Sequence, residues 1–151
     1  MARNRIPSIA MFLIPAILII STILYAQADI EEHRYCFNCG MDRKAFGFSR
    51  VLLRFDDGTA IGVCSLHCAV AAVEADSGRT VMSIEVADRD TRALINAEKA
   101  FWVIGGDKPG VMAATATWAF AEKKRAENFV KRHGGHSASF KEAHDAAFQA
   151  E

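Results

Sequence analysis

Four cysteines in two close pairs constrain this chain more than any other feature of its sequence. Cys36 and Cys39 form a C-x2-C pair, 24 residues follow, and Cys64 and Cys68 form a C-x3-C pair. Two cysteines at such spacings can point at one ion when they lie on a turn or on one helix face. Thiolate is a soft ligand that suits Cu(I) and Zn(II). The spacing therefore predicts a metal site that draws on both pairs.

The cysteine spacing alone leaves three interpretations open. Four cysteines in this pattern are typical of a structural zinc site, and they suit a copper site equally well. Disulfides are the third interpretation, because closely spaced cysteines oxidise in an extracytoplasmic space. Cys64 and Cys68 lie at i and i+4 near an expected helix start, so they can share a face. We expect the helix N-terminus to lower the pKa of both thiols.

Met41 favours copper among these interpretations. It follows Cys39 by two residues, with Gly40 between them, so thiolate and thioether fall within one turn. Glycine allows a tight loop there. A thioether has little use for Zn(II) but suits Cu(I). The alternative is that Met41 only fills a gap in the core.

The N-terminus carries an uncharged apolar segment, residues 6–26, preceded by Arg3 and Arg5. A basic start followed by such a run is typical of an export signal, and Ala26-Gln27-Ala28 matches the A-x-A pattern of a cleavage site. The run is also long enough to serve as an uncleaved membrane anchor. We expect residues 1–28 to be a signal peptide or an anchor. Both alternatives place the remainder outside the cytoplasm.

Composition excludes some classes of protein. The chain has 18 Lys and Arg residues and 18 Asp and Glu residues, and a zero formal charge argues against nucleic-acid binding. Hydrophobic residues make up 51% of the chain, which argues against disorder. No nucleophile–base motif is recognisable, so we do not expect an enzyme.

The remaining pattern predicts an α+β fold of two ββαβ units with small antiparallel sheets. Asp29–Tyr35 is polar and is expected to be an extended linker. Asp56-Asp57-Gly58 is a hairpin turn signal, and Ser65 is a plausible N-cap. The expected strands are 49–55, 59–63, 80–86, 93–95, 100–104 and 137–140. The expected helices are 65–75, 118–132, which stops at His133-Gly134-Gly135, and 141–150.

The chain resembles the NosL family, the copper-binding accessory proteins of nitrous oxide reductase. The resemblance covers roughly residues 35–142 and rests on several short stretches in the family's order. These stretches are Cys39-Gly40-Met41, Val63-Cys64-Ser65, the run from Asn96 to Asp107, Gly110-Val111-Met112, Ala126 to Phe129, and His133-Gly134-Gly135. We therefore expect a NosL-like metal-binding domain over residues 29–142, followed by a helix end or tail at 143–151.

The resemblance implies a periplasmic Cu(I) chaperone, with the two ββαβ units of that family. It would deliver copper to apo-nitrous oxide reductase, together with the membrane maturation machinery of that enzyme. By motif match Cys39 and Met41 are Cu(I) ligands, and Met112 is a candidate third ligand. Family members are usually lipoproteins, but no lipidation cysteine follows the apolar segment here. The domain would thus be soluble in the periplasm or anchored to the inner membrane by residues 6–26.

Two alternative functions remain at this stage. Cys36, Cys39, Cys64 and Cys68 could hold Zn(II) in a structural interaction module, whose domain unfolds when the metal is removed. Cys36 and Cys39 could instead serve an exported thiol–disulfide protein, although no thioredoxin-like βαβ pattern surrounds them.

Overall fold

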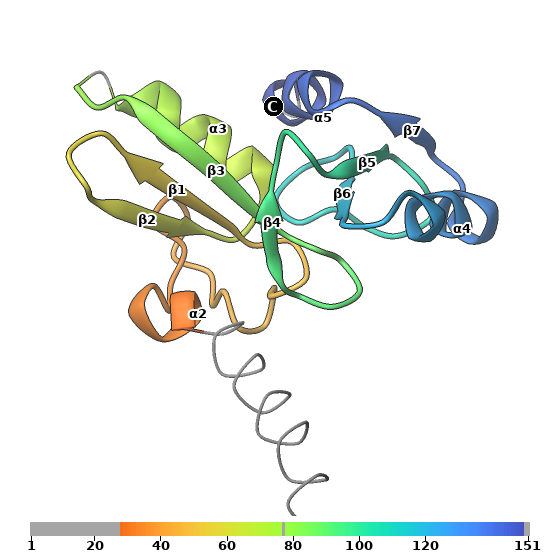
Figure 1. Ribbon diagram of the computed structural model, residues 1–151, viewed down its shortest axis with the longest axis horizontal. Helices are drawn as coiled ribbons and strands as arrows, with labels where there is room; N and C mark the ends of the chain where they lie inside the picture. The colour runs from red at the N-terminus through yellow and green to blue at the C-terminus, as the bar shows by residue number, and fades with distance from the viewer. Residues whose placement is uncertain (1–27, 77, 150–151) are drawn as a thin grey trace, which may run out of the picture.

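Two small antiparallel sheets and four helices make up residues 28–149 except residue 77, the part of the chain that the computed structural model describes (Figure 1). The elements run in the order α2 (Ala28–Glu32), β1 (Val51–Phe55), β2 (Ala60–Val63), α3 (Leu66–Ala75), β3 (Val81–Ala87), β4 (Leu94–Asn96), β5 (Phe101–Ile104), β6 (Thr117–Phe120), α4 (Lys123–His133), β7 (His136–Ala138) and α5 (Phe140–Phe148). The predicted α+β class with two antiparallel sheets is confirmed. The expected signal or anchor segment, residues 6–26, lies outside the described residues. Among the described helices, none has the length and apolar character needed to cross a membrane.

The first sheet has the strand order β2-β1-β3-β4. The β1–β2 hairpin forms as predicted, with Val51 paired to Val63 at its open end and Gly58 in the turn at a φ of 82°. Side chains alternate between the two faces of a strand. Accordingly, Val51, Leu53 and Phe55 join the main core.

Helix α3 covers the core face of this sheet. It begins as predicted, because the Ser65 hydroxyl accepts a hydrogen bond from the Cys68 amide at 3.3 Å and so caps the helix. Leu66, Ala69 and Val70 are buried against the strands. The cap fixes the first turn of α3 directly after the end of β2, which is where the second cysteine pair lies.

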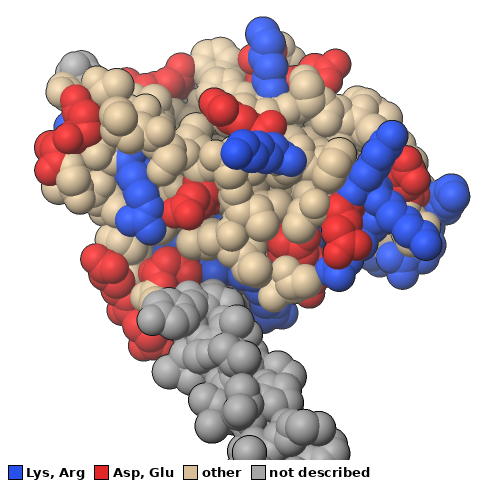
Figure 2. All heavy atoms as spheres, in the orientation of Figure 1, with Lys and Arg blue, Asp and Glu red and all other residues tan. Residues whose placement is uncertain are grey.

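The second sheet has the order β6-β5-β7, and its strands are all antiparallel. Helix α4 packs Ala126 and Phe129 onto Val103 and Phe120, while its outer face is charged. Figure 2 shows a group of Lys and Arg side chains on the side where α4 lies, with acidic side chains beside them. This solvated basic face matches the amphipathic pattern of the α4 sequence.

Helix α5 closes the main core from the other side. It packs on α3 and on β5, and its residues Ala143 and Ala147 are buried. Ser139 and Glu142 form a capping box at its start. Because α5 ends at Phe148, the boundary expected at residue 142 falls inside a packed helix.

Asp88 joins the two sheets. It is fully buried directly after β3, and its carboxylate accepts hydrogen bonds from the amides of Thr91 at 2.7 Å and of Ala121 at 2.6 Å. Ala121 directly follows β6 in the second sheet. One buried carboxylate thereby fixes how the two sheets meet.

Two expectations about the second unit are wrong. Residues 118–120 are the end of strand β6 and not the start of a helix, which begins only at Lys123. In addition, β4 pairs with β3 in the first sheet, so the second hairpin is β5–β6. Trp118 and Phe120 are buried in the core under α4, and this tertiary contact outweighs the helix propensity of the segment.

The linker expected at Asp29–Tyr35 is also wrong. Its first part is helix α2, in which Ile30 is buried and Asp29 forms ion pairs with Arg43 and Arg50. Figure 1 shows α2 below the β1–β2 hairpin, on the side away from α3. Asp29 is polar because it takes part in buried ion pairs, whereas Glu31 and Glu32 on the same helix are exposed.

Candidate metal centre

The first cysteine pair lies on a tight loop between α2 and β1. The Cys36 amide donates to the Met41 carbonyl at 2.8 Å, and the Gly40 amide donates to the Cys36 carbonyl at 2.8 Å. Gly40 has a φ of 76°, a conformation that residues with side chains rarely adopt. The loop is tied to the hairpin because the Phe37 amide donates to the Gly62 carbonyl at 2.9 Å. Cys36 and Cys39 are therefore held beside the end of β2.

The second cysteine pair lies where β2 meets α3. Cys64 directly follows β2, and Cys68 lies in the first turn of α3. The Ser49 hydroxyl donates to the Cys64 carbonyl at 2.8 Å, which fixes the backbone between strand and helix. The predicted shared face is confirmed, since the two sulfur atoms lie 3.6 Å apart.

The two pairs meet in one cluster of four sulfur atoms. The sulfur atoms of Cys36, Cys39, Cys64 and Cys68 all lie within 4.8 Å of one another, and Cys39 Sγ lies 3.5 Å from Cys64 Sγ. All four cysteines are free thiols, with the measured separations far above the disulfide bond length of about 2.05 Å. Four sulfurs placed about 2.3 Å from a tetrahedral metal lie about 3.8 Å apart. The cluster therefore has the size of a metal–thiolate site.

Exposure within the cluster is uneven. Cys36 is 3% exposed and Cys64 and Cys68 are fully buried, whereas Cys39 is only partly buried. A metal held here would be reached from the side of Cys39. Phe37, two residues before Cys39 in the same loop, is 64% exposed.

The pKa values in the cluster differ from the expectation for the second pair. Hydrogen bonds with Cys36 raise the pKa of the Cys64 thiol and raise the pKa of Cys68 to about 11. Hydrogen bonds from Cys64 and Cys68 conversely lower the pKa of Cys36. The expectation that the helix N-terminus lowers both pKa values in the second pair is wrong, because neighbouring sulfurs and burial outweigh the helix dipole. These shifts favour deprotonation of Cys36 over deprotonation of Cys64 and Cys68.

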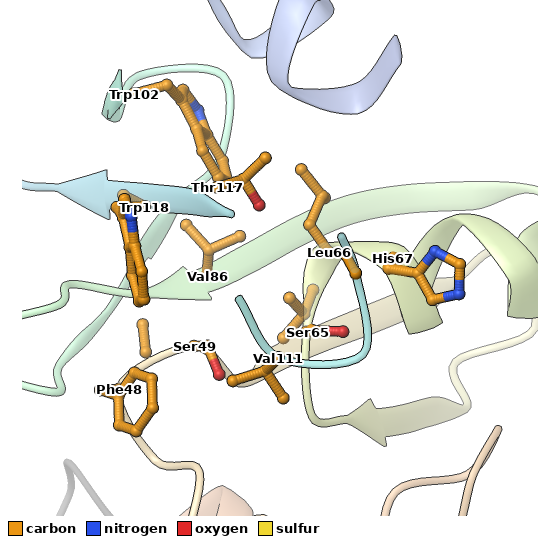
Figure 3. A pocket seen from close by; sticks show the side chains of 14 residues that line it. Phe48, Ser49, Ser65, Leu66, His67, Val86, Trp102, Val111, Thr117 and Trp118 are labelled. Carbon is orange, nitrogen blue, oxygen red and sulfur yellow. The ribbon is translucent and has the colours of Figure 1, made fainter. Parts of the chain in front are cut away.

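The two candidate methionines occupy different surroundings. Met41 is partly buried and packs against the core cluster that contains Cys36, Cys64 and Cys68. Met112 lies in the loop between β5 and β6, with a φ of 58°, and is 45% exposed. Its neighbour Val111 lines a cavity together with Ser65 (Figure 3). The loop that carries Met112 thus approaches the N-terminal end of α3.

Residues that the sequence did not single out lie behind the cluster. Arg43 and Arg50 have fully buried side chains and share the carboxylate of Asp29. Burial lowers the pKa of Arg43, and attraction to Asp29 and to Cys36 raises it in part. The sequence offers one local signal for this network, Arg50 directly before the apolar strand β1. The acidic partner of the two arginines lies 14 and 21 residues away, which no local pattern reveals.

Comparisons with known proteins agree with this fold. The sequence model of the NosL family matches residues 27–148, which include every cysteine and both candidate methionines. The chain belongs to the NosL family. A search of curated proteins gave no significant match.

A solved NosL structure shares the fold. The crystal structure of the copper chaperone NosL from Shewanella denitrificans matches with a TM-score of 0.57 at 24% identity. The match covers 72% of this chain and 87% of that one. The predicted family resemblance is confirmed, and the four-cysteine cluster of this NosL chain is capable of binding a metal.

Proposed function

We propose that this NosL protein is a Cu(I)-binding metallochaperone that delivers copper for the assembly of nitrous oxide reductase. Family membership and the copper chaperone from Shewanella denitrificans support the class of function. The observation that carries the proposal is the cluster of four soft sulfur donors, within 4.8 Å of one another and open at Cys39. Its role is binding and transfer of a metal, not catalysis.

The uneven burial of the cluster suits metal transfer. An incoming ligand can replace metal ligands one at a time, and Cys39 is the one it reaches first. Met41 lies two residues further in the same loop and offers a thioether, which suits Cu(I). Cys36, Cys64 and Cys68 retain the ion from the buried side until the acceptor has bound it. Met112 is a further candidate ligand of the loaded or transferring state.

The proposed location and partners follow from the same function. The acceptor is apo-nitrous oxide reductase, served together with its membrane maturation machinery, in the periplasm. The uncharged segment of residues 6–26 supports export, followed by release or by anchoring to the inner membrane.

A structural zinc module is the second candidate. The observation in its favour is that the cluster offers four cysteine sulfurs, the number and type of ligand that structural zinc prefers. It predicts that the domain unfolds without metal. The thiol–disulfide alternative, based on Cys36 and Cys39, predicts instead that the Cys36→Ser protein loses thiol-exchange activity.

Metal titration of the full chain, purified anaerobically and fully reduced, tests these candidates. We expect one Cu(I) to bind more tightly than Zn(II), with the circular dichroism spectrum of the apo protein unchanged by loading. We also expect the loaded protein to transfer copper to apo-nitrous oxide reductase faster than free chelated Cu(I) does. Preferred Zn(II) binding with unfolding on chelation would contradict the proposal and favour the zinc module.

A further inference from the structure

Asp29, Arg43 and Arg50 form a buried charged triad behind the metal centre. The side chains of both arginines are fully buried, and that of Asp29 is 7% exposed. Asp29 Oδ2 accepts from Arg43 Nη2 at 2.9 Å and from Arg50 Nε at 2.9 Å, while Oδ1 accepts from Arg50 Nη2 at 2.9 Å. Two cations and one anion leave the triad with one positive charge.

Arg43 connects this triad to the segment that carries Cys64. Its Nε donates to the Val63 carbonyl at 3.2 Å, and Val63 directly precedes Cys64. Its other nitrogens reach the carbonyls of Val51, paired opposite Val63, and of His33. One guanidinium thus holds the open end of the β1–β2 hairpin against the chain that leads into the cysteine loop.

The hairpin is shaped to receive this side chain. A Cβ on Gly62 would contact the Arg43 guanidinium and would lie 2.6 Å from His33 Cβ. Only glycine leaves room for Arg43 at this point of β2. The guanidinium therefore occupies a fitted position and not a chance gap.

We infer that Arg43 is a positioning and charge-balancing residue of the metal centre. Each cysteine that binds a metal does so as a thiolate, so Cu(I) held by two or more thiolates carries a net negative charge. Arg43 Nε lies 3.2 Å from the carbonyl of Val63, so the guanidinium lies beside the backbone that carries the thiolate of Cys64. The buried positive charge of the triad and the negative charge of the loaded cluster therefore stabilise each other. The acidic side chains of Glu31 and Glu32 on α2 are exposed, so solvent screens them.

The inference rests on the proposed metal binding and predicts effects of opposite sign. Arg43→Gln removes the positive charge, so we expect Cu(I) affinity to fall about tenfold. Arg43→Lys keeps the charge and should restore most of that loss. Asp29→Asn raises the net charge of the triad while Arg43 keeps its carbonyl contacts. The affinity of the folded protein for Cu(I) should therefore rise. Arg54→Gln, at an exposed position on β1, is the matched control and should leave the affinity unchanged.

The experiment is a competition titration of the full, reduced chain against a chromophoric Cu(I) chelator at one pH and ionic strength. Circular dichroism of each apo variant separates folding from binding. If Arg43 had a purely structural role, the Arg43→Lys and Arg43→Gln proteins would bind Cu(I) equally weakly, or Asp29→Asn would also weaken Cu(I) binding. Either result overturns the inference. If Arg43→Gln does not fold, Arg50→Gln lowers the same buried charge while every Arg43 contact remains, and unchanged affinity there overturns it too. Failure of the wild-type chain to bind Cu(I) would instead remove the proposed function itself.

Discussion

The sulfur atoms of Cys39 and Cys64 lie 3.5 Å apart, although 25 positions separate them in the sequence. The β1–β2 hairpin returns the chain to the cysteine loop, and the hydrogen bond from the Phe37 amide to the Gly62 carbonyl joins the two segments. Cys64 also has a second close sulfur neighbour, Cys68 Sγ at 3.6 Å, and we therefore call it the central sulfur of the cluster. The metal centre therefore depends on hairpin geometry as well as on local spacing.

Replacing the central sulfur should affect binding most. We expect Cys64→Ala to lower Cu(I) affinity more than Cys39→Ala does, because Cys64 contacts two other sulfurs and Cys39 lies at the open side. Chelator competition of the reduced proteins measures the difference. Equal affinities in both variants and in the wild type would remove the cluster as the binding site.

Met41 should contribute a ligand that an exposed methionine does not. We expect Met41→Leu to weaken Cu(I) binding about tenfold, which corresponds to 1.4 kcal/mol, with the fold retained. Met82→Leu, at a position 67% exposed on β3, is the control and should bind as the wild type does. Met112→Leu belongs in the same titration series. If Met112→Leu loses as much Cu(I) affinity as Met41→Leu does, Met112 belongs to the site. If Met41→Leu binds Cu(I) as the wild type does, Met41 is a core residue only.

A methyl group at Gly62 should disturb the metal centre from behind. Because its Cβ would overlap Arg43 and His33, we expect Gly62→Ala to lower the free energy of unfolding by about 2 kcal/mol. Cu(I) affinity should fall with it, since Arg43 must move away from Val63. Gly78→Ala is the control, because its Cβ would come no closer than 3.9 Å to Asp76. Urea denaturation measures the free energy of unfolding, and chelator competition measures the Cu(I) affinity. If Gly62→Ala matches the wild type in both, Arg43 can move without affecting stability or metal binding.

The Asp88 carboxylate should be the main polar group that holds the two sheets together. We expect Asp88→Ala to lower the free energy of unfolding by about 3 kcal/mol, because it leaves the buried amides of Thr91 and Ala121 without their acceptor. Glu98→Ala, on an exposed turn, should change it by less than about 0.5 kcal/mol. Urea denaturation of the reduced apo proteins gives both values, and similar values would mean that water replaces the carboxylate at no cost.

Acid should destabilise the domain through Asp29. Burial raises the pKa of this carboxyl, but hydrogen bonds and attraction from Arg50 and Arg43 outweigh burial and hold the pKa below its ordinary value of 3.8. A carboxyl whose pKa is lowered on folding stabilises the protein above the unfolded pKa of about 4, and this contribution is lost as the pH falls through the folded value.

The measurement is the free energy of unfolding of the apo protein between pH 7 and pH 3. We expect a decrease below about pH 4. The decrease should be shallower in Asp29→Asn, whereas Glu31→Gln, at an exposed position of the same helix, should follow the wild type. An unchanged slope in Asp29→Asn would contradict the role given to this carboxyl.

The sequence predicted the elements around the metal centre well, because their signals are local. The Asp56-Asp57-Gly58 turn, the Ser65 cap and the i, i+4 cysteine pair each depend on residues within a few positions of one another. The meeting of the two cysteine pairs follows once the hairpin is known. The same locality explains why the family resemblance could be carried by short motifs.

The sequence failed where distant contacts decide the structure. Strand β6 has all of Trp118, Ala119 and Phe120 buried, so it lacks the alternation that marks a half-buried strand. The local sequence predicts a linker where helix α2 lies, because the partners of Asp29 are the distant Arg43 and Arg50. The pairing of β4 with β3 instead of β5 is likewise decided by tertiary contacts.

The order of the elements also sets the order in which the metal centre is made. Every sulfur of the cluster comes from residues 36–68, whereas α5, which packs on α3, is the last described element of the chain. If the chain is exported N-terminus first, all four thiols emerge before Ala143 and Ala147 can cover the helix that holds Cys68. During that interval the thiols are exposed to oxidants. Early capture of an ion would protect the thiols and give the emerging chain its first fixed point of folding.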